Sequence, residues 1–191
     1  MSHRGQRDSI STGVLILIGA NVLFFLATTI HPALTFSLGL EPASVSERPW
    51  TAVTSLFIHD GIWHILTNML TLYFFGGYLS SLIGEVSLFI IYFGGGIAGS
   101  LLFILLAPSS SIGIGASGAV FALGGALTVM RPQLRVIAFP IPVPLPLWVA
   151  VIGGFVIMSL LPNIAWQAHL GGLAFGLVAG YVLSQRRRRS S

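Results

Sequence analysis

Six apolar stretches make up most of this chain, and they constrain its fold more than any other feature. They run over Ile10–Ile30, Trp63–Leu82, Glu85–Leu106, Ser117–Met130, Leu147–Leu161 and Ala165–Leu183. Only 7% of the 191 residues are charged and 54% are hydrophobic, whereas soluble domains carry about 25% charged residues. So few charges cannot cover a core with a polar surface. We therefore predict an all-α, polytopic membrane protein, a bundle of six transmembrane helices.

The first connection, His31–Ile58, is unlike a solvated loop because it is rich in apolar and aromatic residues, among them Phe36 and Trp50. Tryptophan favours the membrane interface, so we expect this first loop to be embedded in the membrane. The first apolar stretch exceeds the roughly 7–15 residues of a signal-peptide core, and we expect it to remain as a helix. One transmembrane domain over residues 10–184 is predicted, with polar tails at residues 1–9 and 185–191.

The arginines lie almost entirely on one side of such a bundle. Six spans place both termini on the same side, together with the loop that follows Met130. Eight of the 9 basic residues fall there, namely Arg4, Arg7, Arg131, Arg135 and Arg186 to Arg189, and only Arg48 falls opposite. Cytoplasmic segments are enriched in arginine and lysine. We therefore predict cytoplasmic termini, in a multi-pass protein of a prokaryotic cell membrane.

The fourth stretch is too short to cross a bilayer unaided. As a helix, Ser117–Met130 spans about 21 Å, against about 30 Å of hydrocarbon. Arg131 holds its inner end at the membrane surface, so Ser117 lies roughly 10 Å below the outer surface. Irregular backbone at that depth is tolerated only where protein surrounds it or water lines it. We predict a water-accessible cavity, open to the outside, with Ser117 at its floor.

Three other polar side chains are expected near the same depth. His169 lies about 25 Å above the inner boundary when the sixth helix is counted from Arg186. His64 and Asn68 lie near the outer end of the second stretch, and residues four apart share one helix face. Ionisable groups at membrane depth are candidates for function.

Small residues allow the helices that carry these groups to approach each other. Gly118 follows the serine, and Gly172 and Gly176 lie one and two turns below His169 on the same face. Small residues four apart favour tight helix packing in membranes. The fourth and sixth helices are therefore expected to bring the imidazole to the Ser117 hydroxyl.

A serine and a histidine in such an apolar chain suggest a nucleophile and its general base. A serine at the start of a helix also has free backbone N–H groups nearby, which favour a developing oxyanion. The chain has no cysteine and no His-Glu-x-x-His pattern, which excludes a thiolate nucleophile and that zinc-protease chemistry. No acid lies beyond Glu85, so a Ser117–His169 dyad is expected rather than a triad.

These residues resemble the motifs of the rhomboid intramembrane serine proteases in their minimal six-helix form. The matching patterns are His64-Ile65-Leu66-Thr67-Asn68, Gly115-Ala116-Ser117-Gly118 and Ala168-His169-Leu170-Gly171-Gly172 with Gly176. Their order, spacing and helix assignment agree with that family over about residues 10–183.

The resemblance implies a serine endopeptidase that needs no cofactor and no metal. It implies that Ser117 is the nucleophile, that His169 is the base, and that His64, Asn68 and the Ser117 N–H form the oxyanion hole. Its partners would be the lipid bilayer and single-pass membrane proteins, whose transmembrane segments it would cleave near the outer face. His59 matches a histidine that the family often has before the second helix, and we expect His59, like His31, to be structural or solvated.

Two positions depart from the family pattern. The family usually has Trp-Arg in its first loop, L1, whereas this chain has Trp50-Thr51, with Arg48 two residues before the tryptophan. Many members have a tyrosine four residues after the serine that stacks on the histidine. Here Phe121 keeps the ring, and it is the candidate for orienting His169 without a carboxylate.

Two other classes of function stay open from the sequence. A small transporter is one, although we find no inverted repeat and no charged residue at mid-membrane. A catalytically silent rhomboid-like protein that binds transmembrane clients is the other, although such proteins lose one or both of the residues that Ser117 and His169 match. The net charge of +4 does not indicate nucleic-acid binding, because four of the 9 basic residues form the Arg186 to Arg189 run. We interpret that run as a topology anchor.

Overall fold

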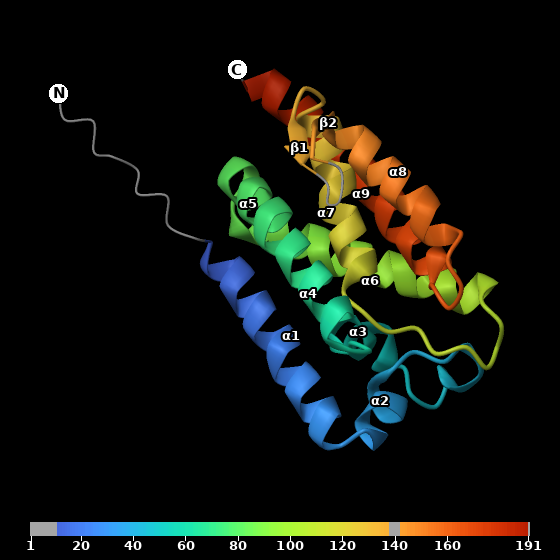
Figure 1. The fold of residues 1–191 in the computed structure, drawn as a ribbon. Helices are drawn as coiled ribbons and strands as arrows, with labels where there is room; N and C mark the ends of the chain where they lie inside the picture. Colours follow the sequence, from blue (N-terminus) through green and yellow to red (C-terminus); the bar gives the residue numbers. More distant parts are fainter. Residues whose placement is uncertain (1–10, 138–141, 191) are drawn as a thin grey trace.

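Long helices dominate the structure, a computed structural model that describes residues 11–137 and 142–190 (Figure 1). They are α1 (Thr12–Ile30), α6 (Glu85–Leu106), α7 (Ser117–Met130), α8 (Leu147–Ser159) and α9 (Trp166–Ser190), while α4 (Ile62–Thr71) continues through the π-helical turn η3 (Leu72–Gly76) into α5 (Gly77–Ile83). The predicted tail at residues 1–9, with Arg4 and Arg7, lies outside the described residues.

The helix predictions are confirmed closely for two stretches and less closely for the others. α6 and α7 have the predicted bounds, whereas α8 ends two residues early, at Ser159. The predicted end of the last helix at residue 183 is wrong, because α9 runs through the arginines to Ser190. Arginine is a good helix former, so a run of arginines ends an apolar span without ending the helix.

The helix α7 lies in the middle of the bundle, with α9 and α6 packed against it (Figure 1). Ten of its 14 residues are buried. Small residues at the helix contacts allow the backbones of neighbouring helices to come close to α7. On Gly172 and Gly176 of α9, a Cβ would lie less than 3.0 Å from the backbone of Gly118 and of Ala122, respectively. Only glycine at these positions permits the observed approach of α9 to α7.

The predicted first loop is built largely of short helices. These are α2 (Ala33–Leu38), η1 (Pro42–Ser44), α3 (Thr51–Thr54) and η2 (Ser55–Phe57). The loop pairs with the connection before α7 through an isolated bridge in which Leu40 and Gly113 exchange N–H···O bonds of 3.0 and 2.7 Å. The segment that leads into α7 is therefore held by the first loop.

Arg48 ties the first loop together internally. Its guanidinium lies 2.9 Å from the Glu41 carboxylate and also hydrogen-bonds to the hydroxyl of Ser44 and the carbonyl of Phe36. The Thr51 hydroxyl donates to the Arg48 carbonyl over 2.7 Å. Arg48, three residues before Thr51, therefore links several parts of the first loop.

A small β-hairpin interrupts the otherwise helical fold, in the proline-rich connection that follows Met130. The strands β1 (Arg135–Ile137) and β2 (Pro144–Pro146) are antiparallel, with Val136 opposite Leu145. Proline is tolerated in edge strands, where no ladder N–H is required of it, and a two-stranded hairpin consists only of edges. The prediction of an all-α fold thus holds for the bundle and misses this hairpin.

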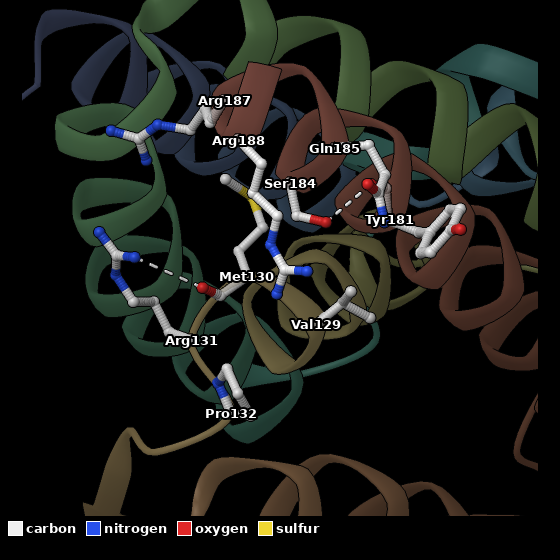
Figure 2. A pocket seen from close by; sticks show the side chains of 9 residues that line it. All are labelled: Val129, Met130, Arg131, Pro132, Tyr181, Ser184, Gln185, Arg187 and Arg188. Carbon is white, nitrogen blue, oxygen red and sulfur yellow. Dashed lines mark hydrogen bonds between the residues drawn. The ribbon is translucent and has the colours of Figure 1, made fainter. Parts of the chain in front are cut away.

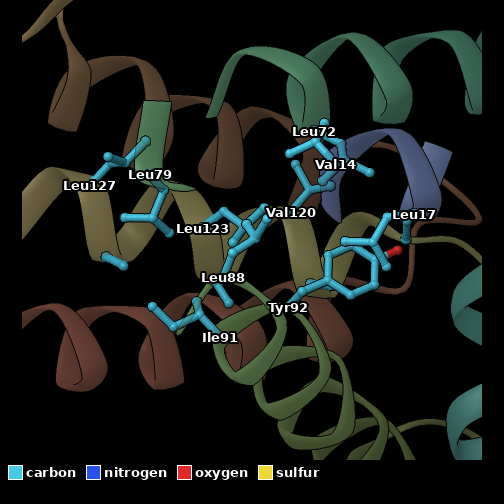
Figure 3. Close-up of a cluster of buried hydrophobic side chains, with 14 of the residues drawn as sticks. Val14, Leu17, Leu72, Leu79, Leu88, Ile91, Tyr92, Val120, Leu123 and Leu127 are labelled. Atoms are coloured by element: carbon cyan, nitrogen blue, oxygen red, sulfur yellow. The ribbon is translucent and has the colours of Figure 1, made fainter. Parts of the chain in front are cut away.

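The core contains side chains from α1, η3, α5, α6 and α7 (Figure 3). One polar link crosses it: the Asn21 amide donates to the Leu17 carbonyl over 2.7 Å and to the Tyr92 hydroxyl over 3.3 Å. The outer faces are also apolar, since Leu23 is 66% exposed and Leu105 is 74% exposed. Exposed apolar surface of this extent indicates contact with a membrane or a partner. By length and composition, α1 and α6 suffice to cross a membrane.

Candidate active site

Ser117 is the first residue of α7 and is half-buried. The chain reaches it through Gly115, whose φ of 114° lies in a region that residues with a side chain rarely adopt. Space is also restricted there, because a Cβ on Gly115 would lie 2.6 Å from Nε2 of His64. Glycine at position 115 therefore permits both the turn and the close approach of His64.

His169 lies on α9 with its imidazole against the start of α7. Its Nε2 is 2.7 Å from the Ser117 Oγ, within hydrogen-bond distance. The side chain is only 3% exposed. The close contact of Gly172, one turn after His169 on α9, with Gly118, the residue after Ser117 on α7, sets the separation of the two helices at this point.

No carboxylate orients the His169 imidazole in the described part of the chain. Its Nδ1 is buried and has no hydrogen-bond partner there. The Phe121 ring lies against the imidazole instead, with 4.8 Å between ring centroids and 35° between ring planes. Phe121 is held in turn by Phe155 of α8, edge-on at 6.1 Å. Ring packing is thus the structural constraint on the imidazole plane.

His64 and Asn68 lie one turn apart on α4. The Nδ1 of His64 accepts from the Asp60 backbone N–H over 3.3 Å, so the neutral imidazole carries its proton on Nε2. That Nε2 faces the Gly115 turn. A hydrogen-bond donor is therefore directed towards the residues that precede Ser117.

Asn68 is buried, and its amide nitrogen donates to the His64 carbonyl over 2.9 Å. An amide nitrogen has two hydrogens, so this bond leaves the second one for another acceptor. The structure does not bring the Asn68 side chain into a hydrogen bond with Ser117 among the described residues. Asn68 lies on the same helix as His64, and the hydrogen bond to the His64 carbonyl restrains its side chain.

His59 has a closer relation to this site than the sequence suggested. Its Nε2 accepts from the backbone N–H of Ala116, the residue before Ser117, over 3.4 Å. Its ring lies edge-on to that of His64, with centroids 4.9 Å apart. Burial, and secondarily the charge of His64, lowers the pKa of His59 from 6.5 to about 4. Nothing in the sequence besides the family pattern distinguished it from another loop histidine.

Glu85 lies away from the dyad. Its carboxylate accepts from the Ser11 hydroxyl and the Gly13 N–H, both over 3.1 Å, at the start of α1. Asp60 is exposed, its backbone N–H donates to His64, and its carboxylate acts on His64 and not on His169. Neither acid contacts His169, which agrees with the expected dyad.

Two cavities formed by the described residues lie away from Ser117. A cavity of 610 Å³ is lined by the end of α7, the residues that follow it and the last turns of α9, including Met130, Arg131 and Tyr181 (Figure 2). A second, of 350 Å³, lies on the α6 and α9 surface. Neither includes Ser117 or His169, so the predicted water-accessible cavity above Ser117 stays a prediction.

Comparisons with known proteins agree on one family. The family model described as the Rhomboid domain matches residues 46–186. Rhomboid protein 1, mitochondrial, of Saccharomyces cerevisiae is 34% identical over 152 residues, which cover 72% of this chain and 44% of that protein. RHOMBOID-like protein 4 of Arabidopsis thaliana is 36% identical over 150 residues, which cover 76% of this chain and 37% of that protein. The chain therefore spans less than half the length of these two relatives.

Proposed function

Because the chain belongs to the rhomboid family, a family of intramembrane serine proteases, we propose that it is an intramembrane serine endopeptidase. The observation that carries this proposal is the 2.7 Å separation of the Ser117 Oγ and the His169 Nε2. A nucleophile and a base within hydrogen-bond reach are the minimum requirement for acyl transfer. Its substrates are transmembrane segments of single-pass membrane proteins.

Acylation begins with proton transfer between the two residues of the dyad. His169 Nε2 takes the hydroxyl proton of Ser117, and the Oγ attacks the carbonyl carbon of the scissile peptide. The tetrahedral intermediate collapses, the C–N bond breaks, and His169 gives its proton to the leaving amine. Water then attacks the acyl-enzyme with His169 again as the base, which restores the Ser117 hydroxyl.

The oxyanion is stabilised by donors from two elements. The Nε2–H of His64 and the free amide hydrogen of Asn68 come from α4, and the Ser117 N–H comes from α7. The first N–H groups of a helix lack intrahelical acceptors, so the Ser117 N–H is available to a ligand. Fixed donors of this kind contribute more in a site shielded from water than they do in bulk water.

Phe121 takes over the orienting function that an acid performs in a triad. An imidazole that has no carboxylate partner must be held by packing, and Phe121 lies against it with 4.8 Å between ring centroids. The second ring, Phe155, lies on α8. Movement of α8 would therefore change the packing of the base.

For the membrane arrangement, we propose six spans: α1, the continuous helix from α4 to α5, α6, α7, α8 and α9. The first loop lies in the outer interface, and both termini are cytoplasmic, as the eight-to-one division of the basic residues supports. Residues 10–184 then form the protease domain, flanked by the short tails. A prokaryotic cell membrane is the proposed location.

Labelling by a fluorophosphonate, together with cleavage of a single-pass substrate in liposomes, tests this function. Wild-type protein should be labelled and should cleave, and Ser117→Ala and His169→Ala should each abolish both reactions without loss of thermal stability. The double variant should be no worse than either single variant, because the two residues act as a unit. Cleavage at the wild-type rate by Ser117→Ala would overturn the proposal. A client-binding protein or a transporter would show no labelling at all.

A further inference from the structure

Two backbone N–H groups just before Ser117 are held from outside their own segment. The Gly115 N–H donates to the Ser55 carbonyl over 2.9 Å, and the Ala116 N–H donates to Nε2 of His59 over 3.4 Å. Ser55 lies in η2 at the end of the first loop, and His59 follows this loop directly before α4. Gly115 gives the turn a positive φ, which glycine adopts readily, so this φ does not by itself fix the peptide units that follow. The two hydrogen bonds restrain these units from outside.

The surroundings of His59 require one particular tautomer. Its Nδ1 lies 3.3 Å from the carbonyl of Phe57, which can only accept, so Nδ1 carries the proton. Its Nε2 faces the N–H of Ala116, which can only donate, so Nε2 carries the lone pair. Both contacts are satisfied by the neutral Nδ1–H form and by no other form.

His64 has the opposite tautomer, with its proton on Nε2. Its Nδ1 accepts from the Asp60 N–H, which leaves the proton on Nε2 and directs a donor towards the Gly115 turn. The two imidazoles lie edge-on with centroids 4.9 Å apart. One ring therefore faces the same turn with an acceptor and the other faces it with a donor.

We infer that His59 is a positioning residue for the oxyanion hole: as a neutral Nδ1–H imidazole it holds the Ala116 N–H and thereby fixes the peptide that leads into Ser117. This inference rests on the proposed function and assigns to His59 a part in it. The peptide unit between Ala116 and Ser117 carries the Ser117 N–H, so rotation of the preceding unit would redirect that donor. His59 itself does not contact the reacting atoms.

The first test compares two substitutions at His59. His59→Phe keeps a ring but has no acceptor, and His59→Gln places an amide oxygen near the position of Nε2. Loss of one oxyanion donor typically costs about 10²–10³ in rate, and we expect misplacement of one to lower kcat about 10- to 100-fold in His59→Phe, with KM unchanged. His59→Gln should restore kcat to within a few-fold of wild type. His31→Phe, the same change at an exposed histidine, is the matched control and should have wild-type kinetics.

An inhibitor series separates positioning from simple loss of structure. A peptidyl aldehyde forms a tetrahedral adduct with its oxygen in the oxyanion hole, whereas the product peptide that carries the new amino terminus has no carbonyl oxygen from the scissile bond and does not use that hole. In His59→Phe, the inhibition constant of the aldehyde should rise by the same factor as kcat falls, and product affinity should stay constant. Equal weakening of both ligands, or a kcat loss that His59→Gln does not rescue, would make His59 a structural residue and overturn the inference.

A spectroscopic readout decides the inference without reference to activity. In ¹⁵N NMR of the wild-type protein at neutral pH, His59 should show a pyrrole-type Nδ1 and a pyridine-type Nε2, and His64 should show the reverse. The Ala116 amide should exchange with solvent faster in His59→Phe than in wild type or His59→Gln. An Nε2–H tautomer at His59, or unchanged exchange of Ala116 in His59→Phe, would refute it. If wild type neither labels nor cleaves, the proposed function fails, while these spectra still decide whether His59 holds the turn.

Discussion

Replacement of Gly172 by alanine should weaken the fold and the dyad together. A Cβ at this position would lie 2.6 Å from the carbonyl carbon of Gly118 and even closer to the carbonyl oxygen, whereas ordinary contacts begin at 3.4 Å. A backbone carbonyl cannot rotate away as a side chain can, so α9 must retreat from α7 by roughly 1 Å. Overpacking of this kind costs about 1–3 kcal/mol, offset in part by about 0.5–1 kcal/mol because alanine is the better helix former.

The same displacement reaches the catalytic pair. His169 lies one turn before Gly172 on α9, so a retreat of about 1 Å lengthens the 2.7 Å contact between Ser117 and His169. A misplacement of that size can cost about 10²-fold in rate. We expect Gly172→Ala to lower both the melting temperature and the rate of fluorophosphonate labelling, the latter even at temperatures where the variant is fully folded.

Two further glycine variants separate these effects. Gly180→Ala introduces the same kind of clash on the same helix, with its Cβ 2.6 Å from the Ala126 oxygen, but far from His169. It should lose stability and keep its labelling rate. Gly153→Ala on α8 meets nothing within 4 Å and should be as stable as wild type or more so. If Gly172→Ala matched wild type in both melting temperature and labelling rate, the reasoning about the α7 and α9 contact would be refuted.

Four other predictions follow from the site. Phe121→Ala should lower the cleavage rate by about 10- to 100-fold, because the imidazole is no longer held in place. Phe121→Tyr keeps the ring and should keep the wild-type cleavage rate. Equal losses in the two variants would show that the ring does not orient His169. Asn68→Ala should lower kcat about 10²–10³-fold with little change in KM, and a change confined to KM would make Asn68 a binding residue. Glu85→Gln should leave the cleavage rate within a few-fold of wild type, while a large loss at unchanged stability would reveal a triad. The unfolded chain binds a proton at His59 near pH 6.5 and the folded chain only near pH 4, so the contribution of His59 to stability should fall by about 3 kcal/mol as the pH is lowered through this range. His59→Gln should reduce the slope of the melting temperature against pH there, and an unchanged slope would contradict this assignment.

Much of the helical framework could be predicted because the relevant information is local. The bounds of α6 and α7 follow from apolar runs flanked by glycine, serine or arginine. Local information also has limits: the arginines that end the last apolar run do not end α9, and the proline-rich segment forms the β1–β2 hairpin. At the end of α9, the apolar run stops but the helix propensity does not, because arginine is a good helix former. In the proline-rich segment, the composition does not specify which residues pair across the two strands.

The residues of the proposed dyad could be named from the sequence, whereas their separation could not. Ser117 and His169 are 52 positions apart, and their distance depends on how closely α9 approaches α7. The pair Gly172 and Gly176 predicts close packing, but it does not specify which turn of the partner helix is met. That register is a property of all the side chains between the two helices.

Composition and spacing along the chain were enough to predict apolar helices, one of which begins at the serine of a Gly-Ala-Ser-Gly run, and to show that no acid lies beyond Glu85. The family pattern marked His59, but it took the folded structure to show how its surroundings differ from those of His31, another histidine between α1 and α4. His31 is exposed, while His59 is buried with its Nε2 against the Ala116 N–H, 57 positions away. The physical reason is that the function of an imidazole is decided by the donors and acceptors that face it, and these come from segments that only folding brings together.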